Sequence, residues 1–142
     1  IMICASEDVG NADPQAIQVA TACAQAVERV GMPEAQIILT QAATYVACAP
    51  KSNSVVNAIF AAMDAVKTIG NCQVPVHLRD AHYAGAEKLG NTGYKYAHDY
   101  ENHYVKQQYL PDPLVGRTFY EPGNLGYEKH IQDWFHNIKK EK

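Results

Sequence analysis

Histidine and aspartate residues gather in one part of this sequence, where they could form a metal site. The segment 74–104 contains His77, Asp80, His82, His98, Asp99 and His103. Imidazole and carboxylate groups are the usual protein ligands of zinc, iron and manganese. His77 and His82 are five residues apart, which on a helix turns them about 140° away from one another. They therefore do not share a helix face, as the two histidines of a zinc-protease motif do.

The dipeptide His98–Asp99 allows a second kind of metal chemistry. It resembles the core of the HD superfamily of all-α metal phosphohydrolases, in which histidines and aspartates hold the metal ions. The resemblance would make His77 or His82 the upstream ligand and Asp112 or Asp133 the downstream one. The dipeptide lies among tyrosines and outside any regular helical pattern, so we favour polar residues that hydrogen-bond loop backbone. The metal-dependent phosphohydrolase remains the alternative.

Two other segments carry polar residues beside expected helix starts. The segment APKSNS places Lys51 and two serines at a helix N-terminus, which is a generic anion site. We favour the simpler interpretation, in which Ser52 or Asn53 is the N-cap of a helix that follows a proline stop. Glu7 and Asp8 precede another helix start, where carboxylates are favourable for capping and for the helix dipole.

Other catalytic chemistries lack their motifs in this sequence. There is no G-x-x-x-x-G-K-[ST] phosphate loop and no G-x-S-x-G nucleophile elbow. The four cysteines are widely spaced with no C-x-x-C pair, and three of them lie among alanines, so we expect them to be reduced and buried. We assign no catalytic, cofactor-binding or metal-ligating residue to this chain.

The composition favours one soluble domain in a reducing compartment such as the cytoplasm. With 142 residues the chain can bury a core without disulfides or a structural metal. Its net charge of −3 would repel phosphate backbones, so tight nucleic-acid binding by this chain alone is not expected. The sequence opens on Ile1 with no initiator methionine, and we therefore expect a fragment of a longer protein.

Proline, glycine and capping residues divide the first half of the chain into helices. Asp13 and Pro14 form a strong helix start, and Gly31 can close the same helix. Such signals predict helices over about 13–31, 33–50, 52–70 and 79–89 within a helical core of about 1–89. The third helix has an apolar stripe formed by Val56, Ile59, Phe60, Met63 and Val66. Helices this rich in alanine can approach closely, which favours a compact all-α bundle.

The second half predicts a long irregular segment followed by a last helix. Residues 90–123 are rich in tyrosine and proline and lack helical periodicity, so we expect an ordered wrap in which the tyrosine rings supply burial. A helix over about 124–140 has an apolar face formed by Tyr127, Ile131, Trp134 and Ile138. We expect it to dock on the body of the domain through Trp134, with Lys139, Lys140 and Lys142 near its negative end.

Several longer motifs follow one another along the chain. They are ASEDVGNADPQA, APKSNS, VPVHLRDAHYAGAEKLG, GYKYAHDY and QQYLPDPLVGRTFYEP. In this order they resemble the C-terminal domain of the replication-associated recombination protein A (MgsA/RarA) family of AAA+ ATPases, over nearly the whole chain. The resemblance implies a helical domain similar to the collar of clamp loaders, which drives homotetramer assembly.

The resemblance also implies what lies outside this chain. The Walker motifs, with ATP and Mg²⁺, belong to an N-terminal module of the full-length protein. That protein would act with single-stranded DNA-binding protein and with DNA at forks or ends, in the cytoplasm at the nucleoid. We therefore expect a non-catalytic homo-oligomerisation domain of a DNA-dependent AAA+ ATPase that works in replication-fork maintenance and recombination. Such an interface typically buries on the order of 2,000 Å² or more.

The family motifs mark a set of candidate structural or interface residues. They are Ser6, Glu7, Asp8, Asp13, Lys51, Ser52, Asn53, His77, Arg79, Asp80, His82, Tyr83, Gln107, Gln108 and Tyr109. A third hypothesis is a monomeric adaptor that binds DNA through Lys51, Arg79, Lys88 and Lys95.

Overall fold

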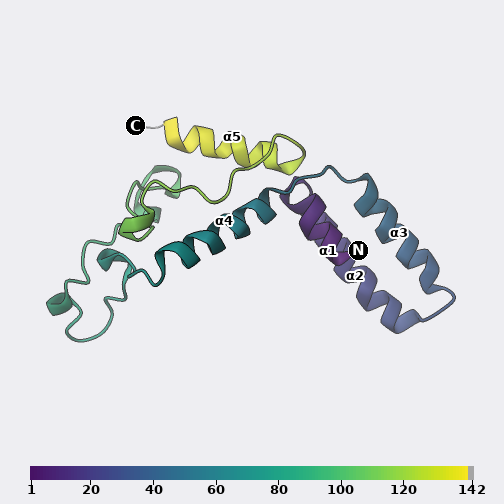
Figure 1. Ribbon diagram of the computed structural model, residues 1–142, viewed down its shortest axis with the longest axis horizontal. Coiled ribbons are helices and arrows are strands. Elements are labelled where there is room, and N and C mark those ends of the chain that lie inside the picture. The colour runs from purple at the N-terminus through teal and green to yellow at the C-terminus, as the bar shows by residue number, and fades with distance from the viewer. Residues whose placement is uncertain (141–142) are drawn as a thin grey trace. The chain divides into compact units, whose positions relative to one another are not determined.

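The computed structural model describes residues 1–140, and the regular elements of that part of the chain are helical (Figure 1). The α-helices are α1 (Met2–Cys4), α2 (Gln15–Val30), α3 (Ala35–Cys48), α4 (Ser54–Ile69) and α5 (Tyr127–Lys140). A π-helical turn, Ala5–Val9, and a 3-10 turn, Gly10–Ala12, lead from α1 towards α2. No residue among 1–140 lies in a strand, which confirms the all-α prediction.

Contacts divide the chain into two compact units. The first contains residues 1–61 and the C-terminal segment from Phe119, and the second contains residues 62–118. Besides the end of α4, the regular elements of the second unit are five short 3-10 turns: Val76–Leu78, Glu87–Leu89, Ala97–Asp99, Glu101–His103 and Asp112–Leu114. The division therefore falls inside α4, whereas the sequence predicted a helical core that extends to about residue 89.

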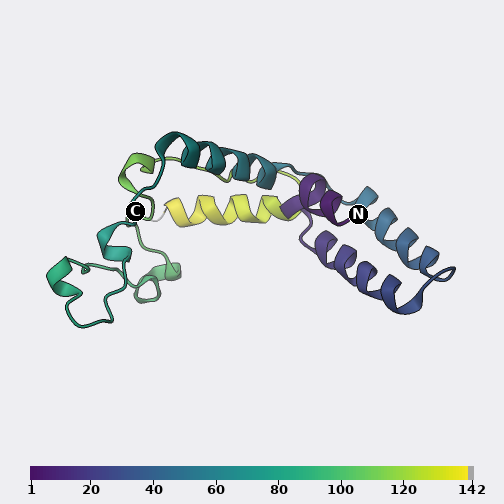
Figure 2. The same cartoon turned by 60° about the horizontal axis from the view of Figure 1, so that its bottom comes forward.

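The helices α2 and α3 lie side by side and form the body of the first unit (Figures 1 and 2). Their connection, residues 31–34, is short enough to make them an antiparallel pair. The buried cluster beside them consists of small side chains: Ala5, Val9, Ala16, Ala20 and Val46, with Tyr45 and Ala49 packed against it. Small side chains allow backbones to approach closely but remove little apolar surface from water. The core of this unit is therefore thin.

Capping side chains and a glycine lie at the ends of α2 and at the start of α4, where the sequence predicted them. The carboxylate of Asp13 accepts a hydrogen bond from the backbone N–H of Gln15 at 3.0 Å, at the start of α2. Gly31 ends the same helix with a φ of +74°, which a residue with a side chain rarely adopts. At the start of α4 the Ser52 hydroxyl accepts a hydrogen bond from the backbone N–H of Ser54 at 3.2 Å. Side-chain capping and glycine thus mark both ends of α2 and the start of α4.

The short helix expected over 79–89 is not formed. Only Glu87–Leu89 is helical there, as a single 3-10 turn. The Asp80 carboxylate accepts a hydrogen bond from the backbone N–H of His82 at 2.9 Å, a local contact that competes with helix formation. Gly85 has a φ of +98°, which interrupts a right-handed helix. The prediction of a helix was therefore wrong because local side-chain capping outweighs a weak apolar periodicity.

The apolar stripe of α4 lies on its exposed face. Ile59 is 55% exposed, Phe60 69%, Met63 48% and Val66 60%. Helical spacing predicted the helix correctly, but the same spacing is produced by a face that packs in the core and by a face that stays outside. The stripe therefore remains in contact with solvent.

Trp134 in the terminal helix and the tyrosines of the second unit are more exposed than the sequence predicted. Trp134 is 51% exposed, so the prediction that α5 docks through it was wrong; α5 is attached at its first turn. The tyrosines of the second unit are each between 41% and 56% exposed: Tyr83, Tyr94, Tyr96, Tyr100, Tyr104 and Tyr109. Their rings therefore do not supply the expected burial. The side chains of Lys139 and Lys140, and the whole of Lys142, lie outside the described part of the chain.

Gly126 allows α5 to approach the N-terminal segment closely. Its φ is +56°, and a Cβ there would overlap the carbonyl oxygen of Ala12 and lie 2.9 Å from Pro50 Cγ. We expect Gly126→Ala to displace the start of α5, with a loss of about 2–3 kcal/mol in the free energy of unfolding. Hydrogen–deuterium exchange of the α5 amides should rise by about tenfold or more.

The control is Gly70→Ala, because Gly70 also has a positive φ, +75°, but open space around it. It introduces backbone strain of about 1 kcal/mol without the overlap. Equal exchange rates in α5 for the two variants would contradict the close approach at Gly126.

Candidate interaction site

A buried carboxylate at the start of α5 joins the start of α4 to the segment that precedes α5. Glu128, in the first turn of α5, has no exposed surface. Its Oε2 accepts hydrogen bonds from Ser52 Oγ at 2.6 Å and from the backbone N–H of Gly123 at 2.7 Å. Its Oε1 accepts hydrogen bonds from Tyr120 OH at 2.9 Å and from the hydroxyl of Ser54. We call Glu128 with these four donors the Glu128 junction.

The four donors keep the Glu128 carboxylate ionised although it is buried. Burial by itself raises the pKa of Glu128, because it disfavours the charged form. The hydroxyls of Ser52 and Ser54, the N–H of Gly123 and the hydroxyl of Tyr120 together outweigh burial and hold the pKa of Glu128 below its ordinary value. The two serines lie at the N-terminal end of α4, where the helix dipole also favours a negative charge. The junction is thus an anion held by neutral donors.

The segment before α2 contacts the junction directly. The backbone N–H of Ser52 donates a hydrogen bond to the carbonyl oxygen of Asp8 at 2.8 Å. The amide of Asn11 donates a hydrogen bond to Tyr120 OH at 3.2 Å. At Gly10, which has a φ of +52°, a Cβ would lie 3.0 Å from the carbonyl oxygen of Ser52. The motifs SEDVGNADP and APKSNS therefore pack against each other in the fold.

Lys51 closes the C-terminal end of α3. Its Nζ donates hydrogen bonds to the carbonyl oxygens of Val46 at 2.8 Å and Ala47 at 3.0 Å. A cation is stabilised at this end of a helix, where the last carbonyl groups lack backbone partners. The ammonium is therefore engaged with the end of α3, and the geometry favours the capping interpretation of APKSNS over an anion site.

Asp13 links α2 to α3 as well as capping α2. Its Oδ2 accepts a hydrogen bond from Tyr45 OH at 2.8 Å. This bond, followed by partial burial, raises the pKa of Tyr45. The side chains of Ser6, Glu7, Asp8 and Asn53 are exposed at the surface of the same unit.

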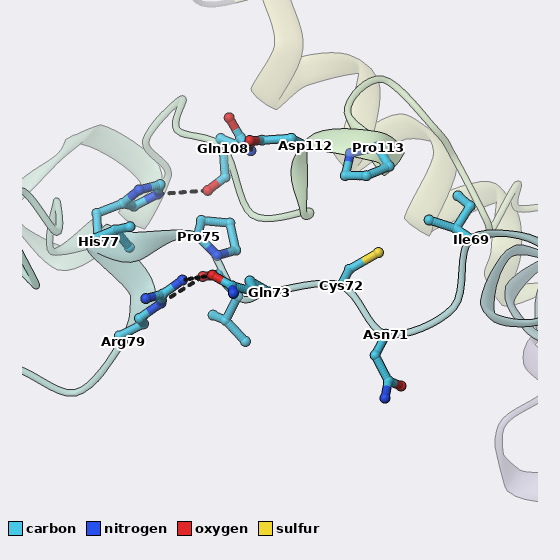
Figure 3. Close-up of a pocket in the computed structure, with 12 residues that line it drawn as sticks. Ile69, Asn71, Cys72, Gln73, Pro75, His77, Arg79, Gln108, Asp112 and Pro113 are labelled. Carbon is cyan, nitrogen blue, oxygen red and sulfur yellow. Dashed lines mark hydrogen bonds between the residues drawn. The ribbon is translucent and has the colours of Figure 1, made fainter.

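The histidines of the second unit do not converge on one point. His77 Nε2 lies 2.7 Å from a backbone carbonyl oxygen, that of residue 108 (Figure 3). His82 Nδ1 lies 2.8 Å from the Asp80 carboxylate in an exposed turn. The rings of His98 and His103 contact one another at a tilt of 51°, with ring centroids 4.8 Å apart. Among the described residues no group of three or more His, Cys, Asp or Glu side chains could hold a metal ion. No such group therefore supports the metal-dependent phosphohydrolase in the described residues.

The second unit contains a cavity of about 470 Å³, which is lined in part by His77, Arg79 and Gln108 (Figure 3). Arg79 Nε donates a hydrogen bond to the carbonyl oxygen of Val74 at 2.9 Å, and its Nη2 donates one to Gln73 Oε1 at 3.0 Å. Gln108 donates two hydrogen bonds within its own loop, to Leu110 O at 2.9 Å and Asp112 Oδ1 at 2.7 Å. These polar groups hold loop backbone in place.

The other motif residues of the second unit act in the same way. Gln107 donates hydrogen bonds to the carbonyl oxygen of Lys95 and to Tyr109 OH, both at 3.0 Å. Its own side-chain oxygen accepts a bond from the backbone N–H of Lys95 at 3.3 Å. The amide of Asn91 donates a hydrogen bond to Tyr83 OH at 3.0 Å. Residues far apart in this irregular segment are therefore tied to one another.

Several large apolar side chains of the first unit are exposed. Its buried residues are mostly alanines, whereas Ile3 is 72% exposed, Ile37 76% and Phe60 69%. A contiguous exposed apolar surface is a common feature of protein interaction sites. The polar junction and the outward apolar faces together make the first unit the candidate interaction site.

Sequence reasoning missed the residue at the centre of this site. Glu128 reads as an ordinary acidic residue in the first turn of a helix, where the dipole favours it. Tyr120 reads as one of many tyrosines, and Gly126 as a loop residue. The pairing of Ser52 with a residue 76 positions away has no signature in one sequence.

Over the described residues the chain is helical and irregular without strands, and its first unit is held by a polar junction and exposes large apolar side chains. The family model described as MgsA AAA+ ATPase C terminal matches residues 1–139. The chain therefore belongs to this family, the C-terminal domains of MgsA-type AAA+ ATPases, which confirms the resemblance drawn from the motifs.

Related proteins occur in several bacteria. The chain is 52% identical over 132 residues to an uncharacterised AAA domain-containing protein of Mycobacterium tuberculosis. The matched region covers 92% of this chain and 29% of the relative. It is 42% identical over 144 residues to the replication-associated recombination protein A of Bacillus subtilis, covering 100% of this chain and 34% of the relative. The identity to the protein of the same name in Escherichia coli K12 is 43% over 129 residues. That match covers 89% of this chain and 29% of the relative. The chain spans about a third of the length of these relatives.

Replacing Glu128 by Gln tests the junction. Glu128→Gln exchanges one acceptor oxygen for an NH₂ group, which cannot accept the hydrogen bond of Gly123 or of Ser52 in its place. We expect a loss of about 2–4 kcal/mol in the free energy of unfolding, measured by urea denaturation with circular dichroism and Trp134 fluorescence. The control is Glu121→Gln, an exposed site expected to change stability by less than about 0.5 kcal/mol. Equal stability of the two variants would argue against the junction.

The junction also predicts a loss of stability in acid. Because the pKa of Glu128 is lower in the folded state than its ordinary value, its contribution to stability is fully present above the ordinary pKa and is lost as the pH falls through the folded-state pKa. We expect the thermal midpoint of the wild type to fall more steeply than that of Glu128→Gln between about pH 5 and about pH 3. Parallel curves for the two proteins would show that Glu128 does not carry this dependence.

Proposed function

We propose that this chain is the homo-oligomerisation domain of a DNA-dependent AAA+ ATPase and that it assembles as a homotetramer. The observation that carries the proposal is the exposed stripe of α4, where Ile59, Phe60, Met63 and Val66 all lie in solvent. Full burial of one such side chain stabilises a protein by about 1.5–3 kcal/mol. A helix with four of them on one side therefore gains substantially from a partner that covers it.

A second copy of the chain is the partner that best fits the rest of the structure. The first unit has a thin core of alanines and small valines, so its own packing stabilises it only modestly. Domains of this kind gain stability when association buries the remaining apolar surface, as in obligate oligomers. Closed homo-oligomers are also the commonest form of soluble protein assembly.

The remainder of the proposal concerns the whole protein, of which this chain is a part. Membership in an AAA+ family supports ATP and Mg²⁺ as ligands of the full-length protein, bound outside this chain. The names of the Bacillus and Escherichia relatives support a role in replication and recombination. We propose that the full-length protein acts on DNA at forks or ends, with single-stranded DNA-binding protein, at the nucleoid in the cytoplasm. No helix among the described residues is long and apolar enough to span a membrane.

In this proposal the domain performs no reaction itself. It gathers several ATPase modules so that they act on one DNA substrate. The engagement of Lys51 with the end of α3 also weakens the case for an adaptor that would bind DNA through this residue.

Light scattering across a dilution series tests the assembly. At tens of micromolar we expect a mass about four times the 15.6 kDa of the chain. Phe60→Asp should shift the protein towards monomer, because it places a charge in the apolar stripe. The control is Asn57→Asp, which adds the same charge to an exposed position of α4 outside the stripe. A monomeric wild type at these concentrations would refute the proposal.

A further inference from the structure

The α2–α3 pair carries an open apolar groove. It is lined mainly by Val19, Ala22, Cys23, Ala26, Ile38 and Ala42, and its volume is about 300 Å³. The groove exists because alanines stand where larger side chains would fill the space between the two helices. An apolar cavity of about 150 Å³ is large enough to bind benzene. This groove therefore has room for a phenyl ring together with a neighbouring aliphatic side chain.

The first two turns of α4 present side chains of matching size. Phe60 is 69% exposed and Ile59, next to it, is 55% exposed. The start of α4 belongs to the same unit as the groove and is fixed by the bonds of Ser52 and Ser54 to Glu128. The two apolar side chains are thus held on a rigid element of the unit, at a definite position relative to the junction.

Both surfaces are free of charge. α2 has no charged residue before Glu28, α3 has none along its whole length, and α4 has none before Asp64. A helix face that stays in solvent normally carries charged residues, whereas the centre of a protein interface is depleted of them. An uncharged groove and an uncharged apolar projection suit each other and disfavour an ionic ligand.

We infer that Phe60 and Ile59 of one copy insert into the α2–α3 groove of a neighbouring copy. The inference rests on the proposed function, because it names the contact through which the copies assemble. Projection and groove are different surfaces of the same chain, so every copy can give one contact and receive another. Such a heterologous contact closes into a ring when the rotation between copies allows it, which is compatible with a tetramer.

An engineered disulfide tests this contact. The native cysteines are first removed by Cys4→Ser, Cys23→Ala, Cys48→Ser and Cys72→Ser. Ile59→Cys and Ala26→Cys are then added, so that Phe60 remains to occupy the groove. Mild oxidation should join the copies covalently into a ladder that ends at the tetramer. Each single-cysteine variant should lose most of this cross-linking.

The outcomes separate the inference from the proposed function. If light scattering finds an assembly but the cysteines at positions 59 and 26 form no disulfide, the inferred contact is wrong. The proposed oligomerisation would still stand. Efficient linking of Ile59→Cys to itself would likewise replace the inferred contact by a symmetric one between two α4 helices. A monomeric cysteine-free chain and a monomeric wild type would overturn both.

A second variant fills the groove from within its own chain. Ala22 is an exposed residue that lines the groove, so Ala22→Phe should leave the fold intact, as unchanged helix content by circular dichroism would verify. We expect the mass by light scattering to fall by about fourfold. The control is Glu28→Phe, an exposed position on another face of α2, which should keep the mass of the wild type. An unchanged mass for Ala22→Phe would overturn the inference.

Discussion

The first unit of this chain depends on the burial of one carboxylate. A buried charge without partners would destabilise the fold strongly, but Glu128 accepts hydrogen bonds from three hydroxyls and one backbone N–H. The donors come from the start of α4 and from the segment that precedes α5. The N-terminal segment in turn contacts both Ser52 and Tyr120. The start of α4 and the segment before α5 therefore converge on one anion, and the N-terminal segment is attached to two of the donors that hold it.

This polar centre explains how the unit can have so small an apolar core. Hydrogen bonds to a charged group are stronger and more directional than contacts between alanines. The junction can therefore fix the attachment of α5 and the start of α4 without large side chains between the helices. Phe60 and Trp134 are not needed for that purpose, and both are at least half exposed. Because these large apolar side chains are not used inside the unit, they remain available for association.

Part of this arrangement could be predicted from the sequence, and the limit has a physical cause. The ends of α2, α3 and α4 follow from proline, glycine and capping residues, which act within a few positions of the chain. The face of α4 that is buried does not follow, because helical spacing is the same for a core face and for an exposed one. The bond between Ser52 and Glu128 spans 76 positions and could not be inferred from local chemistry. The helix expected over 79–89 failed for the opposite reason, since a local bond at Asp80 was strong enough to prevent it.

The polar contacts fix the position of α4, whereas the exposed apolar side chains are available to a partner. This difference affects how such a domain would assemble. Apolar contacts are non-directional, so an interface made of them alone specifies the relative orientation of two copies poorly. A directional junction that fixes α4 before association removes this ambiguity and also reduces the conformational entropy lost on binding. If the copies assemble as proposed, weakening the junction should also weaken assembly, even though Glu128 is not itself part of the apolar stripe. In this domain the stability of the monomer and the geometry of the assembly would depend on the same buried anion.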